Sequence, residues 1–163
     1  MSTVSEPRAG YSGFQIALHW ATALAVVATW FLSDGMGRLL DARLEGGAGT
    51  TWPWHVILGL TVLALVLIRL VTRAMQGAPD PAESGPHWMQ TLGKWTHILL
   101  YLLLIAVPLG GIAMWFLGIE GAGEVHELGG NAILILAGIH AAAGLYHHYV
   151  LKDGTLKRML HPV

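Results

Sequence analysis

The chain has 163 residues, of which 54% are hydrophobic and only 12% charged, with a mean hydropathy of +0.56. This composition is too apolar for a water-soluble globular protein, and the length predicts a single domain over residues 1–163. A formal net charge of −1 provides no basic field, which excludes nucleic acid as a partner. The absence of cysteine excludes disulfides, thiolate metal sites and covalently attached c-type haem.

Long stretches without charged residues predict four transmembrane helices, because about 20 apolar residues are needed to cross a bilayer. The second stretch is short, but Arg69 and Arg73 at its end can extend it by turning their charged groups toward the interface. The predicted fold is an all-α, integral membrane four-helix bundle. Its helices are expected at about 14–33, 52–71, 95–119 and 126–151.

The distribution of lysine and arginine predicts that both termini are cytoplasmic. Seven basic residues lie on the side of the two termini, and only Arg38 and Arg43 lie on the other side. The outer side then combines two basic with six acidic residues, a formal charge of −4. The protein is therefore expected to be a multi-pass protein of a bacterial cytoplasmic membrane, in contact with its lipids.

Nine histidines are the anomaly in this lipid-compatible chain. Burying an imidazole in hydrocarbon without a hydrogen-bond partner costs free energy. A single histidine in a membrane helix can avoid this cost by bonding a backbone carbonyl, but several histidines in such helices predict a function. His126 and His140 are 14 residues apart, which places them on one helix face about 21 Å apart. The expected depths pair His55 with His126 near the outside and His19 with His140 nearer the inside.

The residue four positions after each of these histidines is small. Such a residue lies one turn along the same helix face and leaves room for a flat ligand beside the imidazole. Bulkier residues follow His97, His147 and His148 at this spacing. The small neighbours are Ala23, Gly59, Gly130 and Gly144.

Paired imidazoles in the core of a helical bundle suit haem b, bound without covalent attachment. Two such pairs predict two haems per chain, with His19, His55, His126 and His140 as iron ligands. The uncharged stretches 14–33, 52–68, 95–119 and 128–151 contain no Asp or Glu, which disfavours a zinc or di-iron site. A histidine-based metal transporter and a structural or assembly protein remain as alternatives.

At these residues the chain resembles the bacterial cytochrome b561 family and, more distantly, the cytochrome b subunits of membrane-bound hydrogenases and formate dehydrogenases. The resemblance covers nearly the whole chain. Its most specific part is the closing stretch, which includes His126-Glu127 and GIHAAAGLYHH at 138–148. Earlier parts are QIALHW at 15–20, WHVILG at 54–59 and LGKWTH at 92–97.

The resemblance implies two b haems, one held by His55 and His126 and the other by His19 and His140. Spacing alone leaves open a pair of His19 with His147, which lies two turns beyond His140, and the resemblance assigns His140. It also implies electron transfer between a membrane quinone, such as ubiquinone, and a donor or acceptor at the surface. At least one family member is a superoxide oxidase. An acidic outer face would not attract superoxide unless Arg38 and Arg43 cluster near the outer haem.

Further polar residues gather at the inner ends of the third and fourth helices, where a quinone needs a hydrogen-bond donor and a supply of protons. They are candidates for a quinone site, and the alternative is simple anchoring of the helix end at the lipid interface. The tryptophans fall near the span ends, as in an aromatic belt. The quinone-site candidates are Lys94, His97, His147 and His148.

The sequence thus predicts an oxidoreductase that moves electrons through two b haems between a surface donor and the quinone pool. The main rival is a cytochrome b subunit that anchors a larger hydrogenase or dehydrogenase. A short chain with small loops favours a protein that acts alone.

Overall fold

The computed structural model describes residues 10–46, 52–79, 86–119 and 121–163. Within these ranges the chain is helical and contains no strand, so the all-α prediction is confirmed. The α-helices are α1 (Gly13–Phe31), α2 (Met36–Leu44), α3 (Trp54–Gln76), α4 (His87–Leu117) and α5 (Ala122–Tyr146). A π-helical turn, η1 (His147–Leu151), continues α5, and a short 3₁₀ turn, η2 (Lys157–Met159), follows near the C-terminus.

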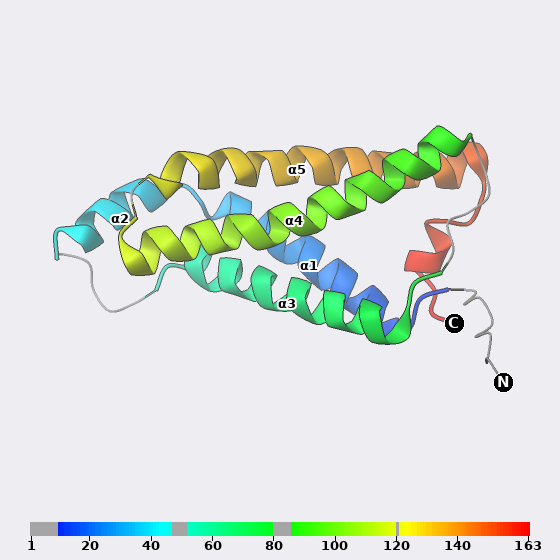
Figure 1. Cartoon of the computed structure of the whole chain (residues 1–163), viewed down its shortest axis with the longest axis horizontal. Coiled ribbons are helices and arrows are strands. Elements are labelled where there is room, and N and C mark those ends of the chain that lie inside the picture. The colour runs from blue at the N-terminus through cyan, green and yellow to red at the C-terminus, as the bar shows by residue number, and fades with distance from the viewer. Residues whose placement is uncertain (1–9, 47–51, 80–85, 120) are drawn as a thin grey trace.

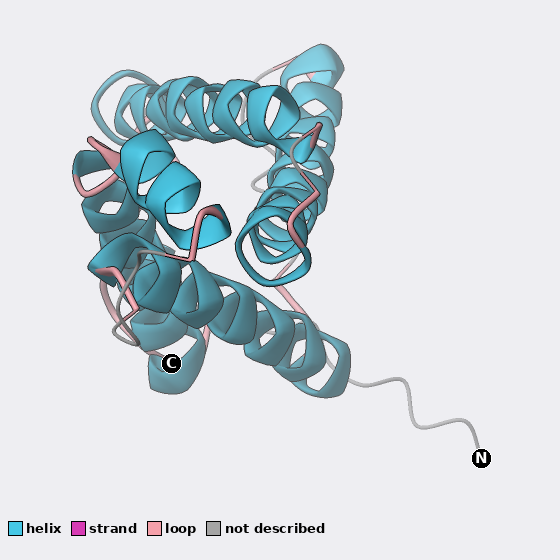
Figure 2. Ribbon diagram, turned by 90° about the vertical axis from the view of Figure 1, so that its left-hand side faces the viewer, coloured by secondary structure: helices cyan, strands magenta, loops and turns pink. Residues whose placement is uncertain are grey.

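Four of the described helices are long and apolar enough to cross a membrane, namely α1, α3, α4, and α5 together with η1. They pack as two neighbouring pairs, α1 with α3 and α4 with α5, and α3 also contacts α4 (Figure 1). Figure 2 shows the bundle from the end at which α2 lies. A small core lies where these helices meet. It consists of Ala25, Val62, Val66, Leu104 and Ile133.

Several helix boundaries differ from the sequence prediction, most of all the start of α4. α4 begins at His87 rather than near 95, because Pro86 occupies the N-cap position with an extended backbone, a common way to start a helix. The connection between α3 and α4 is correspondingly short, since α3 continues to Gln76.

The short helix α2 was not predicted and forms in a segment expected to be a loop. An isolated nine-residue helix has little stability in water, so tertiary contacts must support it. Arg43 supplies one such contact by donating from Nε to the carbonyl of Trp115, at 3.1 Å. α2 thereby lies against the end of α4 (Figure 1).

The bundle has two distinct ends. At the terminal end, the backbone N–H of Val163 donates to the carbonyl of Tyr11, and the indole of Trp20 donates to the carbonyl of Met159. At the opposite end, called the α2 end, α2 lies near the end of α4 (Figure 1), and residues of α2, the start of α3 and the end of α4 line one cavity. The cytoplasmic location of the termini stays a prediction from the charge distribution.

Candidate functional site

His55 on α3 and His126 on α5 lie next to each other near the α2 end. Their ring centroids are 5.9 Å apart and their planes are inclined by 74°. Both side chains are half-buried. We call them the α2-side pair, and the structure brings them together as the sequence predicted.

Each imidazole of the α2-side pair is held by a backbone carbonyl of another helix. Nδ1 of His55 lies 2.9 Å from the carbonyl oxygen of Thr29, and Nδ1 of His126 lies 2.8 Å from that of Val107. A carbonyl oxygen only accepts hydrogen bonds, so both Nδ1 atoms carry the hydrogen. In a neutral imidazole this leaves Nε2 with a free lone pair, the state that a metal ligand requires.

Glycines make this arrangement sterically possible. A Cβ atom on Gly111 would lie 2.9 Å from Cε1 of His126, so only glycine leaves the ring its present position against α4. A Cβ on Gly129 would lie 2.5 Å from Val107, so glycine also permits the close approach of α5 to α4. By contrast, a Cβ on Gly59 or Gly130 would meet no atom within 4 Å, so open space adjoins both histidines as expected.

A cavity contains both imidazoles of the α2-side pair and is otherwise lined mainly by apolar groups from α2, α3 and α4. The lining includes Met36 and Leu40 of α2, so this short helix forms one wall. Trp115 forms part of another wall and is only 6% exposed. Its burial differs from the expectation that tryptophans here lie in an interfacial belt.

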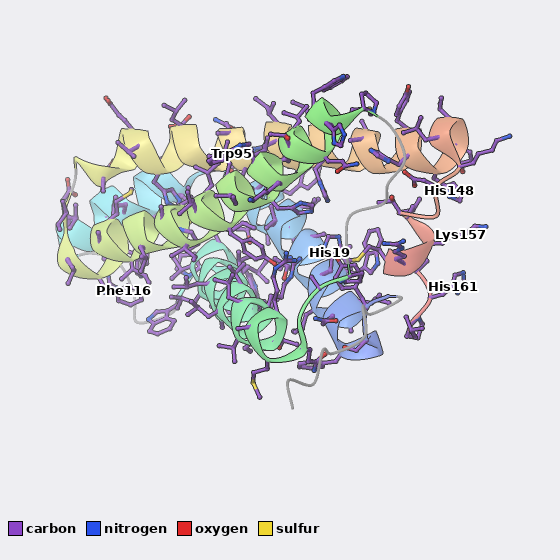
Figure 3. The ribbon with its side chains drawn as sticks, turned by 45° about the vertical axis from the view of Figure 1, so that its right-hand side comes forward. His19, Trp95, Phe116, His148, Lys157 and His161 are labelled. Carbon is purple, nitrogen blue, oxygen red and sulfur yellow. The ribbon has the colours of Figure 1, made fainter. Side chains whose placement is uncertain are left out.

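A second group of histidines lies further toward the terminal end. The ring centroids of His19 on α1 and His140 on α5 are 6.3 Å apart, and we call these two residues the terminal-side pair. A Cβ on Gly144 would meet no atom within 4 Å, which again leaves space next to a histidine. The label in Figure 3 marks His19 between the helices.

His97 and Arg69 also reach the terminal-side pair, which sequence reasoning missed. The ring of His97 lies 4.9 Å from that of His140, centroid to centroid. Nη2 of Arg69 donates to Nδ1 of His19 at 3.0 Å. An imidazole that accepts at Nδ1 carries its hydrogen on Nε2, so ligation through Nε2 of His19 requires Arg69 to release this contact.

The other quinone-site candidates have contacts of their own. Nδ1 of His147 is hydrogen-bonded to a carboxylate oxygen of Asp153, and the His148 ring packs against Tyr149. Lys94 is exposed. Figure 3 shows His148 at the terminal end of the bundle, near the tail that carries Lys157 and His161. The Asp-Gly turn at 153–154 is the sequence signal that could have indicated a partner for His147.

Both histidine pairs have a spacing that suits a shared iron atom. Imidazole nitrogens bind metals at about 2 Å, and the ring centroid lies about 1 Å further back, so two imidazoles on opposite sides of one metal have centroids about 6 Å apart. The observed 5.9 and 6.3 Å agree with this value, whereas the 4.9 Å between His97 and His140 is shorter. Such pairs within an apolar helical bundle fit the class of membrane-bound b-type cytochromes.

Comparison with known proteins gives the family. A profile described as prokaryotic cytochrome b561 matches residues 10–162, and the chain belongs to this family. It is 39% identical to cytochrome b562 of Cereibacter sphaeroides, over 94% of this chain and 96% of that protein. It is 30% identical to cytochrome b561 homolog 1 of Escherichia coli (92% and 96% covered) and 29% identical to a probable superoxide oxidase of Yersinia pestis (92% and 95%).

Membership in this family makes the chain a multi-pass protein of the bacterial inner membrane that transfers electrons by means of haem b. The numerous apolar side chains exposed on its four long helices are therefore in contact with lipid.

Proposed function

We propose that the chain binds two b haems and carries electrons between a partner at the α2 end and a quinone in the membrane. The α2-side pair holds one haem and the terminal-side pair the other. The observation that carries this proposal is the α2-side pair itself. Both of its imidazoles bond backbone carbonyls through Nδ1, and their centroids have the spacing of two ligands on one iron.

Bound haem b supplies an iron centre that accepts and donates one electron at a time. The chain's own residues hold the imidazoles in position and keep water away from them. The carbonyls of Thr29 and Val107 fix the rings of the α2-side pair, and the apolar cavity wall lowers the local dielectric constant. Near the terminal-side pair, Arg69 contributes a permanent positive charge beside His19.

The proposed quinone site lies at the terminal end. A quinone head group needs hydrogen-bond donors close to a haem and a path for protons. His97 is closest to the terminal-side pair, because its ring lies beside that of His140. Asp153 fixes the orientation of His147 nearer the end of the bundle, and Lys94 and His148 complete the set of candidates.

The quinone proposal is tested with purified protein in liposomes that contain a ubiquinol analogue. We expect the analogue to reduce the haems without oxygen. At least one of four alanine variants should slow this reduction while retaining both haems. These variants are Lys94→Ala, His97→Ala, His147→Ala and His148→Ala. His161→Ala is the matched control, because His161 is exposed at the tail. Absence of any electron exchange with quinones would contradict the proposal.

Superoxide is a second candidate for the surface partner, supported by one feature of the α2 end. Arg38 and Arg43 both belong to α2, the helix that forms a wall of the cavity around the α2-side pair. Arg43 lies over the ring of Trp115, which lines the same cavity. Positive charge on this helix is the condition under which an anion could approach an otherwise acidic face. The test is superoxide decay coupled to quinone reduction, at a rate well above that of spontaneous decay.

A further inference from the structure

The indole nitrogen of Trp115 is a buried donor without an acceptor. Nε1 has no hydrogen-bond partner among the residues that the structure describes, although the side chain is only 6% exposed. Leaving a buried N–H unsatisfied costs free energy, so such groups normally have a partner when the protein is complete. Because Trp115 lines the cavity that contains the α2-side pair, a ligand of that cavity is in reach of this indole as the missing acceptor.

A positive charge lies next to this indole. The guanidinium carbon of Arg43 is 4.9 Å from the centre of the Trp115 ring, and Arg43 Nε donates to the backbone carbonyl of the same residue. The described residues that line the cavity include no Asp or Glu. The surroundings of Nε1 therefore favour an acceptor that carries negative charge.

Water is a poor candidate for this acceptor. A buried water molecule typically makes about three hydrogen bonds to polar groups. Apart from Trp115, the only lining side chains with nitrogen or oxygen atoms are His55 and His126. Their Nδ1 hydrogens already bond the carbonyls of Thr29 and Val107. Their Nε2 lone pairs are the ones that bind the iron under the proposed function, so they are not available to a water molecule when haem is bound.

We propose that Trp115 Nε1 donates a hydrogen bond to a propionate carboxylate of the haem on the α2-side pair, with Arg43 balancing the carboxylate's charge. This inference rests on the proposed function, which places a haem in that cavity. A propionate and superoxide are both anions with an oxygen that can accept this hydrogen bond. Superoxide that approaches from the α2 end is therefore the alternative acceptor. Trp115 is a positioning residue in this account, because it acts on the iron only through the carboxylate.

The primary test is Trp115→Phe, compared with Trp95→Phe on the same helix. Trp95 is 61% exposed, so its replacement controls for the loss of an indole. We expect the Trp115→Phe variant to lose the haem of the α2-side pair to apomyoglobin roughly 10-fold faster, because a hydrogen bond to a charged group is lost. The midpoint potential of that haem should become more negative, and the other haem should not change. Equal behaviour of the two variants would overturn the proposal.

Reconstitution with haem dimethyl ester identifies the source of the oxyanion. Esterification removes the carboxylate charge and leaves only a weaker, neutral acceptor, so the difference between wild type and Trp115→Phe in haem loss and potential should shrink markedly. If Trp115→Phe instead slows only the reaction with superoxide and leaves haem loss and potential unchanged, the indole serves the substrate and the proposal is wrong.

A measurement on the wild-type protein covers the case in which Trp115→Phe does not fold. With ¹⁵N-indole-labelled tryptophan, the infrared difference spectrum on reduction of the haems should contain an isotope-sensitive indole N–H band. Its absence would contradict the hydrogen bond. A protein that binds no haem would instead refute the proposed function, so the two failures are distinguishable.

Discussion

The imidazole of His126 on α5 donates its Nδ1 hydrogen to the backbone carbonyl of Val107 on α4, across 2.8 Å. Two glycines permit this contact between the helices: Gly129 lets α5 approach Val107, and Gly111 leaves room for the ring. The bond fixes both the orientation of the imidazole and the position of its hydrogen. His126 is thus prepared as a ligand by the bundle itself.

Gly111→Ala should therefore weaken haem binding without unfolding the bundle. The added Cβ would lie 2.9 Å from Cε1 of His126, so the ring must move and the bond to Val107 is strained. We expect a loss of about 1–3 kcal/mol in haem binding at the α2-side pair. The measurement is the rate of haem transfer to apomyoglobin. Gly138→Ala is the control, because its Cβ would meet no atom within 4 Å; equal effects of the two variants would refute this steric role.

His55→Ala and His126→Ala should each remove the same haem. The centroids of the two rings are 5.9 Å apart, the spacing expected for two ligands of one iron, so loss of either ligand leaves the iron with one imidazole. Haem content should fall by about half in both variants, and the remaining visible spectra should be identical. His87→Ala, at an exposed position, should retain both haems. Different residual spectra for His55→Ala and His126→Ala would show that the two residues do not share an iron.

The partner of His140 is tested by comparing His19→Ala with His97→Ala. The 6.3 Å between the rings of His19 and His140 suits a shared iron, and the 4.9 Å between His97 and His140 is too short. His19→Ala should therefore lose the second haem, and His97→Ala should keep both. Haem extraction and counting per chain is the measurement. Loss of haem in His97→Ala with retention in His19→Ala would reverse the assignment.

Much of this site follows from regular helix geometry. The 14-residue separation of His126 and His140 places two imidazoles at two depths of one helix, and the small residues one turn away predict space beside them. Both features involve residues of the same helix, so they can be recognised in a short stretch of the sequence. The same reasoning also predicts four apolar spans, because bilayer thickness sets their length.

Other features depend on contacts between distant segments and have no local pattern. The bond from Arg69 to His19 joins residues 50 positions apart, and α2 depends on the contact of Arg43 with Trp115. The burial of Trp115 has the same origin, because α2 covers the end of α4 (Figure 1). A short helix with mixed polarity carries too weak a signal to be distinguished from a loop.

Asp153→Ala should loosen the C-terminal tail. One carboxylate oxygen of Asp153 bonds His147, and the other accepts from the backbone N–H of Thr155. Loss of these bonds should destabilise the docked tail by about 1–3 kcal/mol. The measurement is limited proteolysis of the tail around Lys157, which should be faster in the variant. Thr91→Ala, which removes only an exposed bond to the carbonyl of His87, is the control. Cleavage of Asp153→Ala at the wild-type rate would show that the bonds of Asp153 do not hold the tail.

The most direct test of the central claim is a reduced-minus-oxidised visible spectrum of the detergent-purified protein, combined with haem extraction and counting per chain. The account predicts two b haems per chain with the bands of low-spin iron, because two imidazoles hold each one. One haem per chain would contradict the assignment of two pairs. A folded but colourless protein would refute the account of both sites.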